Sequence, residues 1–346
     1  MGHTSYAART VAAGLVLALA AAGCSGDDDG AAAPAPSAAP PPATTTATTG
    51  AVASAAPDLP AVVDVTELDA QVLPGGNGDW AMAVRGDVWV AGLGPGLVAF
   101  DGATGHRVAA VAAGPVHLGM EQAEGDLFLC TDVGELVRVD GARRTARYRA
   151  RLGVHPLEEA SVAVGGGEVF IPTGVPTPGI VVADAATGER LRRIPAPAYS
   201  SGLRYGFGSL WTAVAPDQLV RLDPRTGDVQ DGFTVGGTPV FLSVGASAVW
   251  VMNQADGSAS SVDPRTGEVT TVTVDTGPIQ GGDIVAGRQA VWVRVTDALV
   301  ARVDVRTTAV TLRIGPASGS GSVALSGRNV WITAHDVHHI WRVPQQ

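Results

Sequence analysis

The sequence predicts an all-β fold, a seven-bladed β-propeller of four-stranded blades, on the basis of two repeated features. An aromatic residue recurs at intervals of 39, 42, 41, 39, 42 and 39 residues, each time within an apolar, β-branched run. A polar turn follows most of these runs and reads DPRTG twice, at Asp223–Gly227 and Asp263–Gly267. Repeats of this length with several short strands are typical of sheets arranged in a ring. The aromatic residues are Trp89, Phe128, Phe170, Trp211, Trp250, Trp292 and Trp331.

The DPRTG turn has a structural explanation. The aspartate can accept hydrogen bonds from the following backbone amides, the proline presets φ for a type I turn, and the glycine takes the left-handed conformation that ends it. We therefore expect the turn to join two strands of one blade. No catalytic or metal-binding role is assigned to Asp223 or Asp263.

Each full repeat supplies four strands, and the seventh repeat lacks its last one. An apolar residue stands eight positions before each repeated aromatic residue and marks the innermost strand of the blade. The seventh repeat ends at IWRV, close to the C-terminus. The segment 62–73, VVDVTELDAQVL, can supply the missing strand, so that the N-terminal strand completes the last blade and leaves no open edge. We expect the propeller to occupy residues 61–346.

The first residues predict a secretion signal. The apolar run from Val11 to Ala22 is too short to span a bilayer but suits the core of a signal peptide. The run ends in AAGC, at Cys24, and this resembles the lipobox of bacterial lipoproteins. The resemblance implies cleavage after a signal peptide of residues 1–23 and lipidation of Cys24, although Ala21 stands where the motif usually has leucine. An ordinary signal peptide with a chance cysteine is the alternative.

Residues 24–60 predict a lipidated cysteine followed by a disordered tether. The segment consists almost entirely of Ala, Pro, Thr, Ser, Gly and Asp, which bury too little apolar surface to fold. We expect it to hold the propeller away from the membrane. The lipid anchor would place the protein on the extracytoplasmic face of the cell membrane.

Composition limits the partners. The chain has 346 residues, a net charge of −10 and 23 basic residues, all of them arginine. A nucleic-acid partner requires a cationic surface to neutralise phosphates, so we expect none. The only cysteines are Cys24 and Cys130, so stability has to come from packing and not from a disulfide framework. We expect Cys130 to be a buried core residue and the protein to be a monomer.

The repeats resemble seven-bladed β-propellers of the streptogramin-lyase-like and quinoprotein-like families. The segments LVAFDGATG and VVADAATG are similar to the turn of quinoprotein repeats, and the resemblance covers residues 62–346. It implies a fold that hosts many functions. Quinone-binding members have a tryptophan soon after the turn glycine, whereas His106 and Glu189 follow it here, so no cofactor is expected. Streptogramin lyases use histidine, glutamate and magnesium, but no matching motifs occur, and no catalytic residue is assigned.

Ligands of propellers usually bind over the central channel, near the loops that lead into the innermost strands. Glu121 and Arg204 share one register position on the innermost strands of blades two and four. They form a ligand-gripping pair, a structural ion pair or two separately solvated channel groups. The segment AHDVHH offers His335 and His338 as candidate metal ligands, with an exposed loop as the alternative. The candidate ligand-binding residues are His117, Glu121, Arg204 and Asp283.

These observations favour a membrane-anchored, extracytoplasmic propeller that binds a protein or an envelope component without catalysis. One alternative is a metal-assisted lyase or hydrolase that acts at the mouth of the channel. A small-molecule sensor that uses the same mouth is another. The arrangement of acidic and histidine side chains from different blades at one end of the channel discriminates among them.

Overall fold

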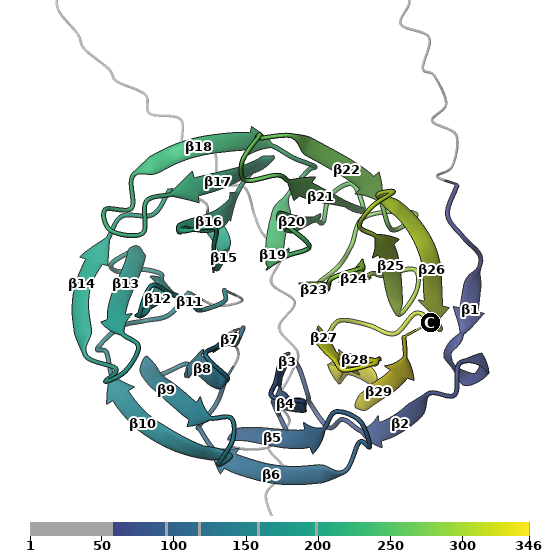
Figure 1. Ribbon diagram of the computed structural model, residues 1–346, viewed down its shortest axis with the longest axis horizontal. Helices are drawn as coiled ribbons and strands as arrows, with labels where there is room; N and C mark the ends of the chain where they lie inside the picture. The colour runs from purple at the N-terminus through teal and green to yellow at the C-terminus, as the bar shows by residue number, and fades with distance from the viewer. Residues whose placement is uncertain (1–57, 94–95, 117–118, 158–159, 198–199, 346) are drawn as a thin grey trace, which may run out of the picture. The chain divides into compact units, whose positions relative to one another are not determined.

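The computed structural model describes residues 58–93, 96–116, 119–157, 160–197 and 200–345. The predicted signal peptide, Cys24, almost all of the predicted tether and His117 lie outside these residues. Seven sheets are arranged in a ring around a central axis, which we call the channel axis or channel, and form the predicted seven-bladed β-propeller (Figure 1). None of the helices in the described part of the chain is long and apolar enough to cross a membrane.

Each blade has four antiparallel strands, ordered from the channel outward. Blade one consists of β3 (Ala81–Val84), β4 (Asp87–Ala91), β5 (Gly96–Asp101) and β6 (Arg107–Ala112), and blade two of β7 (Glu121–Ala123), β8 (Asp126–Cys130), β9 (Glu135–Asp140) and β10 (Thr145–Arg151). Blade three consists of β11 (Ala163–Gly165), β12 (Glu168–Thr173), β13 (Gly179–Asp184) and β14 (Arg190–Ile194), and blade four of β15 (Ser200–Gly206), β16 (Ser209–Val214), β17 (Gln218–Leu222) and β18 (Val229–Thr234). Blade five consists of β19 (Pro239–Gly245), β20 (Ala248–Asn253), β21 (Ser258–Val262) and β22 (Val269–Thr273), and blade six of β23 (Ile284–Ala286), β24 (Ala290–Arg294), β25 (Val300–Asp304) and β26 (Ala309–Gly315). The seventh is β27 (Val323–Ser326), β28 (Asn329–Ala334), β29 (His339–Pro344) and β2 (Gln71–Pro74).

The N-terminal segment closes the ring, as predicted, but it does so at two blades. β2 pairs antiparallel with β29 and completes blade seven, with Gln71 opposite Arg342. β1 (Val62–Asp64) instead pairs in parallel with β26 and adds a fifth strand to blade six (Figure 1). The segment 62–73 is therefore not one strand. It breaks after Asp64, whose carboxylate accepts a hydrogen bond from the backbone N–H of Thr66 and caps the 3-10 helix η1 (Val65–Glu67).

The repeated aromatic residues form the centre of the packing between blades. All seven lie on the second strand of their blade and are buried, which confirms the predicted repeat. The predicted turns are present as well. The carboxylates of Asp223 and Asp263 each accept a hydrogen bond of 2.7 Å, from the backbone N–H groups of Arg225 and Arg265. The glycines that end the two turns have φ values of +78° and +75°.

Strand direction gives the propeller two different faces. Because the strands alternate in direction, the connections into each first strand lie on the same face as the connections from second to third strands. We call this the mouth face, and it includes Asp79, the segment 320–322 and the 3-10 helix η2 (His335–Val337). The turns from first to second and from third to fourth strands, including both DPRTG turns, lie on the opposite face, which we call the turn face.

Candidate functional site

Three of the four candidate ligand-binding residues come together in the channel. Glu121 lies on β7, Arg204 on β15 and Asp283 directly before β23. The Nε atom of Arg204 lies 3.4 Å from a carboxylate oxygen of Glu121, although blade three separates their blades. The backbone N–H of Gln122 donates a second contact to Glu121, at 2.9 Å. The two residues thus form an ion pair across the inner end of blade three.

Asp283 lies close enough for its charge to act on Glu121 and Arg204, and contacts with blade seven hold it in place. One carboxylate oxygen accepts hydrogen bonds from the hydroxyl of Ser322 and the backbone N–H of Val323, and the other accepts one of 2.8 Å from the N–H of Ile284. Asp283 is only 6% exposed. These bonds tie the start of the first strand of blade six to that of blade seven. We call Glu121, Arg204 and Asp283 the channel cluster.

The channel cluster contains two carboxylates and one guanidinium group. Burial raises the pKa of Glu121, with Asp283 adding to the rise and Arg204 opposing it. Burial likewise raises the pKa of Asp283, while the bond from Ser322 and the charge of Arg204 act in the opposite direction. When both acids are ionised, the cluster therefore holds one negative charge in excess of its single cation.

A shallow pocket lies at the mouth end of the channel, and its space of about 230 Å³ includes open solvent. It shares Ser322 with the contacts of the channel cluster. Trp80 and Phe241 form its apolar wall, with ring centroids 5.6 Å apart in an edge-to-face arrangement. We call this the mouth pocket. Its lining residues are Asp79, Trp80, Phe241, Gly281, Gly282, Ser320, Gly321 and Ser322.

The two candidate metal ligands of the AHDVHH segment point to different partners. His335 lies between two carboxylates, with Nε2 2.9 Å from Asp336 and Nδ1 3.3 Å from Asp79. The Nδ1 atom of His338 is instead 2.7 Å from the backbone carbonyl oxygen of Gly76. Within the described ranges, no group of three or more His, Cys, Asp or Glu side chains is placed to hold a metal ion. The segment forms η2, a short connection between β28 and β29.

Arg294 is a buried charge near the mouth pocket that the sequence analysis missed. It is 0% exposed, and its guanidinium group donates hydrogen bonds to the backbone carbonyls of Leu299, Ser318 and Gly319. Burial lowers its pKa to about 10, although Asp336 and Asp283 act to raise it. Arg294 thus holds the loop that brings Ser320 to the pocket.

A signal for Arg294 was present in the repeats. Two positions after the repeated aromatic residue, the other six blades have an uncharged residue, and only blade six has an arginine. The seven residues are Ala91, Cys130, Pro172, Ala213, Met252, Arg294 and Thr333.

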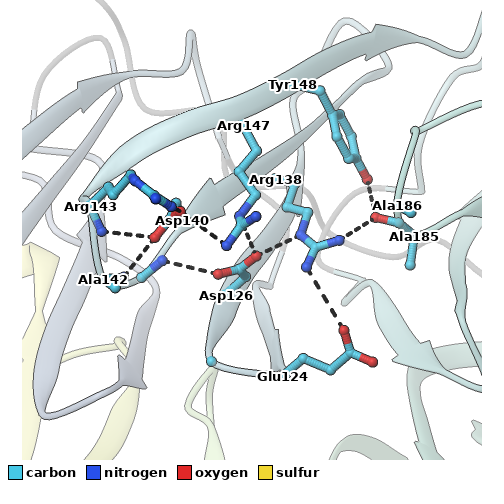
Figure 2. A network of polar contacts seen from close by, with 12 residues as sticks. Glu124, Asp126, Arg138, Asp140, Ala142, Arg143, Arg147, Tyr148, Ala185 and Ala186 are labelled. Carbon is cyan, nitrogen blue, oxygen red and sulfur yellow. Dashed lines mark hydrogen bonds and ion pairs between the residues drawn. The ribbon is translucent and has the colours of Figure 1, made fainter.

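A second charged network lies on the turn face, between blades two and three (Figure 2). Asp126, which is 2% exposed, lies 2.7 Å from the Nε atoms of both Arg138 and Arg147. Arg147 also contacts Asp140 at 3.0 Å. Hydrogen bonds from Arg143 and Ala142 lower the pKa of Asp140 to about 2. This network joins the two blades, since Arg138 also donates to the carbonyl of Ala185, in the turn after β13.

The same region shows that the net charge of the chain hides a local cluster of arginines. The stretch ARRTARYRAR, residues 142–151, contains five arginines, which the net charge of −10 concealed. Four of them form ion pairs with Asp87, Asp126, Asp140 or Glu135, so the stretch is largely neutralised.

Cys130 is the buried core residue that its position predicts. It lies at the end of β8 with no exposed surface. Burial raises the pKa of its thiol to about 12, so the thiolate required of a nucleophile is absent at neutral pH.

Comparison with known proteins identifies the fold. No protein-family model matches the chain, and no curated protein does either. The β-propeller domain of Cps50 (Swd1) from Myceliophteria thermophila superposes with a TM-score of 0.65 and 10% identity, over 80% of this chain and 98% of that one. Kuenenia stuttgartiensis hydrazine synthase gives 0.63 and 14%, over 79% and 96%. BamB from Moraxella catarrhalis gives 0.53 and 15%, over 76% and 84%. At these identities the similarity is one of fold, and the chain is a seven-bladed β-propeller.

Proposed function

We propose that this protein is a lipid-anchored, extracytoplasmic propeller that binds a protein or another envelope component through its mouth face and is not an enzyme. Cys24 in its AAGC context and the Ala/Pro/Thr-rich segment after it support the anchor and the tether. The ring itself supports a binding role, because its closed sheets hold the mouth pocket in a fixed shape without a ligand.

The arrangement of the channel cluster carries the proposal. Glu121 and Arg204 pair with each other, and Asp283 is held by Ser322 and two backbone N–H groups. General acid–base catalysis needs such groups within reach of a substrate. Here their hydrogen-bonding capacity is used within the protein, and the pocket next to them is lined by aromatic, glycine and serine residues besides Asp79. This is a preformed recognition surface.

The anchor is tested by labelling. Cells grown with an alkyne-bearing fatty acid should label the wild-type protein and not a Cys24→Ala variant, and the variant should leave the membrane fraction. A Cys24→Ala protein that keeps the label or remains in the membrane fraction contradicts the anchor.

The binding face is tested by photo-crosslinking from two exposed apolar positions. Val337 is 40% exposed on the mouth face, and Phe207 is 46% exposed on the turn face. A photoreactive amino acid at position 337 should yield a discrete adduct in cells, and the matched replacement at 207 should not. Equal adducts from both positions, or none from either, would contradict binding through the mouth face.

A further inference from the structure

The mouth pocket combines an aromatic wall with a carboxylate. Trp80 and Phe241 are 6% and 4% exposed, so only a small part of each ring reaches the pocket. Asp79 is half-buried in the same lining. Aromatic rings attract cations, and carboxylates pair with them. We propose that the mouth pocket binds a small organic cation, an alkylammonium or guanidinium group. This deepens the proposed binding function and rests on it.

The charges around the pocket leave a surplus of negative charge. Asp79 and Asp336 face His335, and Asp283 lies directly beyond Ser322. The two nearby arginines are already engaged, since Arg204 pairs with Glu121 and Arg294 is bonded to three backbone carbonyls. When Asp79, Asp336, Asp283 and Glu121 are all ionised, four carboxylates stand against two guanidinium groups, and the surplus remains negative even with His335 protonated.

The same polarity extends across the mouth face. Five of the seven connections from second to third strands contain an aspartate and none of these five contains an arginine. On the turn face, four turns between third and fourth strands contain an arginine, although two of them, residues 223–228 and 263–268, also contain two acidic residues each. A face that carries one sign of charge raises the local concentration of the opposite ion and speeds its binding. The aspartates are Asp132, Asp217, Asp256, Asp297 and Asp336; the arginines include Arg143, Arg225, Arg265 and Arg306.

The size and the acceptors of the pocket suit the same ligand. The pocket is a shallow hollow whose space of about 230 Å³ includes open solvent, so at most a small ion or the tip of one side chain can enter it. Ammonium and guanidinium groups carry hydrogen-bond donors only. The hydroxyl oxygens of Ser320 and Ser322 and the carboxylate of Asp79 are acceptors in the lining.

The test is calorimetric titration of the purified protein with ethylguanidinium and butylammonium, and with butanol and butyrate as neutral and anionic probes of similar size. Both cations should bind at least about tenfold more tightly than butanol, a difference of about 1.4 kcal/mol. Asp79→Asn and Phe241→Leu should each weaken cation binding by about fivefold. Asp217→Asn, on the same face and outside the pocket lining, is the matched control and should leave it unchanged.

Several outcomes would overturn the proposal: no binding of either cation by the wild-type protein, equal binding of butanol, or full cation affinity in both pocket variants. If Asp79→Asn fails to fold, the Phe241→Leu variant alone decides the test.

A partner cross-linked through residue 337 without any cation binding would remove this proposal and leave the proposed function standing. Cation binding without a cross-linked partner would leave this proposal standing and remove the proposed function.

A peptide with a single internal arginine separates the two sources of the cation. Tighter binding of the peptide than of ethylguanidinium assigns the group to a partner's side chain, and equal or weaker binding assigns it to a free ligand.

Discussion

Arg204 and Glu121 pair at 3.4 Å although the whole of blade three separates their blades. The two residues share one register position on the innermost strands of blades four and two, and on blade three that position is Ala163, which is fully buried. The pair therefore connects two blades that are not neighbours in the ring.

Removal of the cation from this cluster should destabilise the fold. In Arg204→Met, the two buried carboxylates of Glu121 and Asp283 lose their positive neighbour. We expect a loss of about 2–3 kcal/mol in the free energy of unfolding at pH 7.5, somewhat less than for a fully buried pair because both partners retain some exposure. Urea denaturation measures it.

The double variant Arg204→Met/Glu121→Gln is the control. It removes one of the two uncompensated charges, so it should recover more than half of the loss. Wild-type stability in Arg204→Met, or a double variant no more stable than the single one, would show that the pair does not support the ring.

The shared register of Glu121 and Arg204 was predictable from the sequence, whereas their pairing across blade three and the rest of the site were not. Alternation along a strand is local, so equal spacing from the aromatic residues was enough to place both on the innermost strands at one register. The role of Asp283 depends on Ser322, which a neighbouring blade supplies 39 positions later in the chain. The split of 62–73 into β1 and β2 depends on the capping bond at Asp64, and a run of alternating residues does not reveal that bond.

The cost of ionising Asp283 should appear as a pH dependence of stability. Its pKa in the folded protein is raised above the usual value of about 4, so the ionised form is penalised on folding. The penalty is absent at a pH below the unfolded value and grows as the pH rises toward the folded one. Asp283→Asn should therefore gain stability relative to wild type between pH 4 and pH 7.5, as measured by urea denaturation at both values.

Asp140→Asn is the matched comparison and should show the opposite trend. The pKa of Asp140 is lowered to about 2, so its ionised form stabilises the folded protein, and the stabilisation is lost as the pH falls toward that value. If the stability of both variants relative to wild type changed with pH in the same direction, burial would not be the cause of the pH dependence at Asp283.

His335 should make both stability and cation binding depend on pH. The contact with Asp79 raises the pKa of His335, with help from Asp336 and against burial and Arg294. The protonated form therefore stabilises the folded protein at pH values below about 6.5, and this contribution is lost as the pH rises through the raised value. His335→Gln should be less stable than wild type at pH 5.5, by less than about 1 kcal/mol for so exposed a pair, and nearly equal to it at pH 8.5.

The same proton competes with a bound cation for Asp79. Ethylguanidinium should bind the wild-type protein more tightly at pH 8.5 than at pH 5.5, and His335→Gln should largely remove this difference. His106→Gln, a change on the turn face, should leave the pH dependence of binding intact. If the wild-type protein bound ethylguanidinium equally well at both pH values, protonation of His335 would have no effect on binding in the pocket.

The two DPRTG turns allow a comparison in which the local sequence is identical. Alanine at either glycine must adopt a φ near +75°, at a cost of about 1–2 kcal/mol. The surroundings differ, however. A Cβ at Gly227 would lie 2.6 Å from the backbone carbonyl oxygen of Pro195, whereas a Cβ at Gly267 would lie 3.2 Å from a ring carbon of Phe233. The ring of Phe233 can rotate away from the new methyl group, whereas the carbonyl of Pro195, next to β14, cannot move without shifting the backbone. Gly227→Ala should therefore lower the free energy of unfolding, measured by urea denaturation, by about 1–2 kcal/mol more than Gly267→Ala does. Equal losses would mean that turn geometry alone, without the contact to the neighbouring blade, requires these glycines.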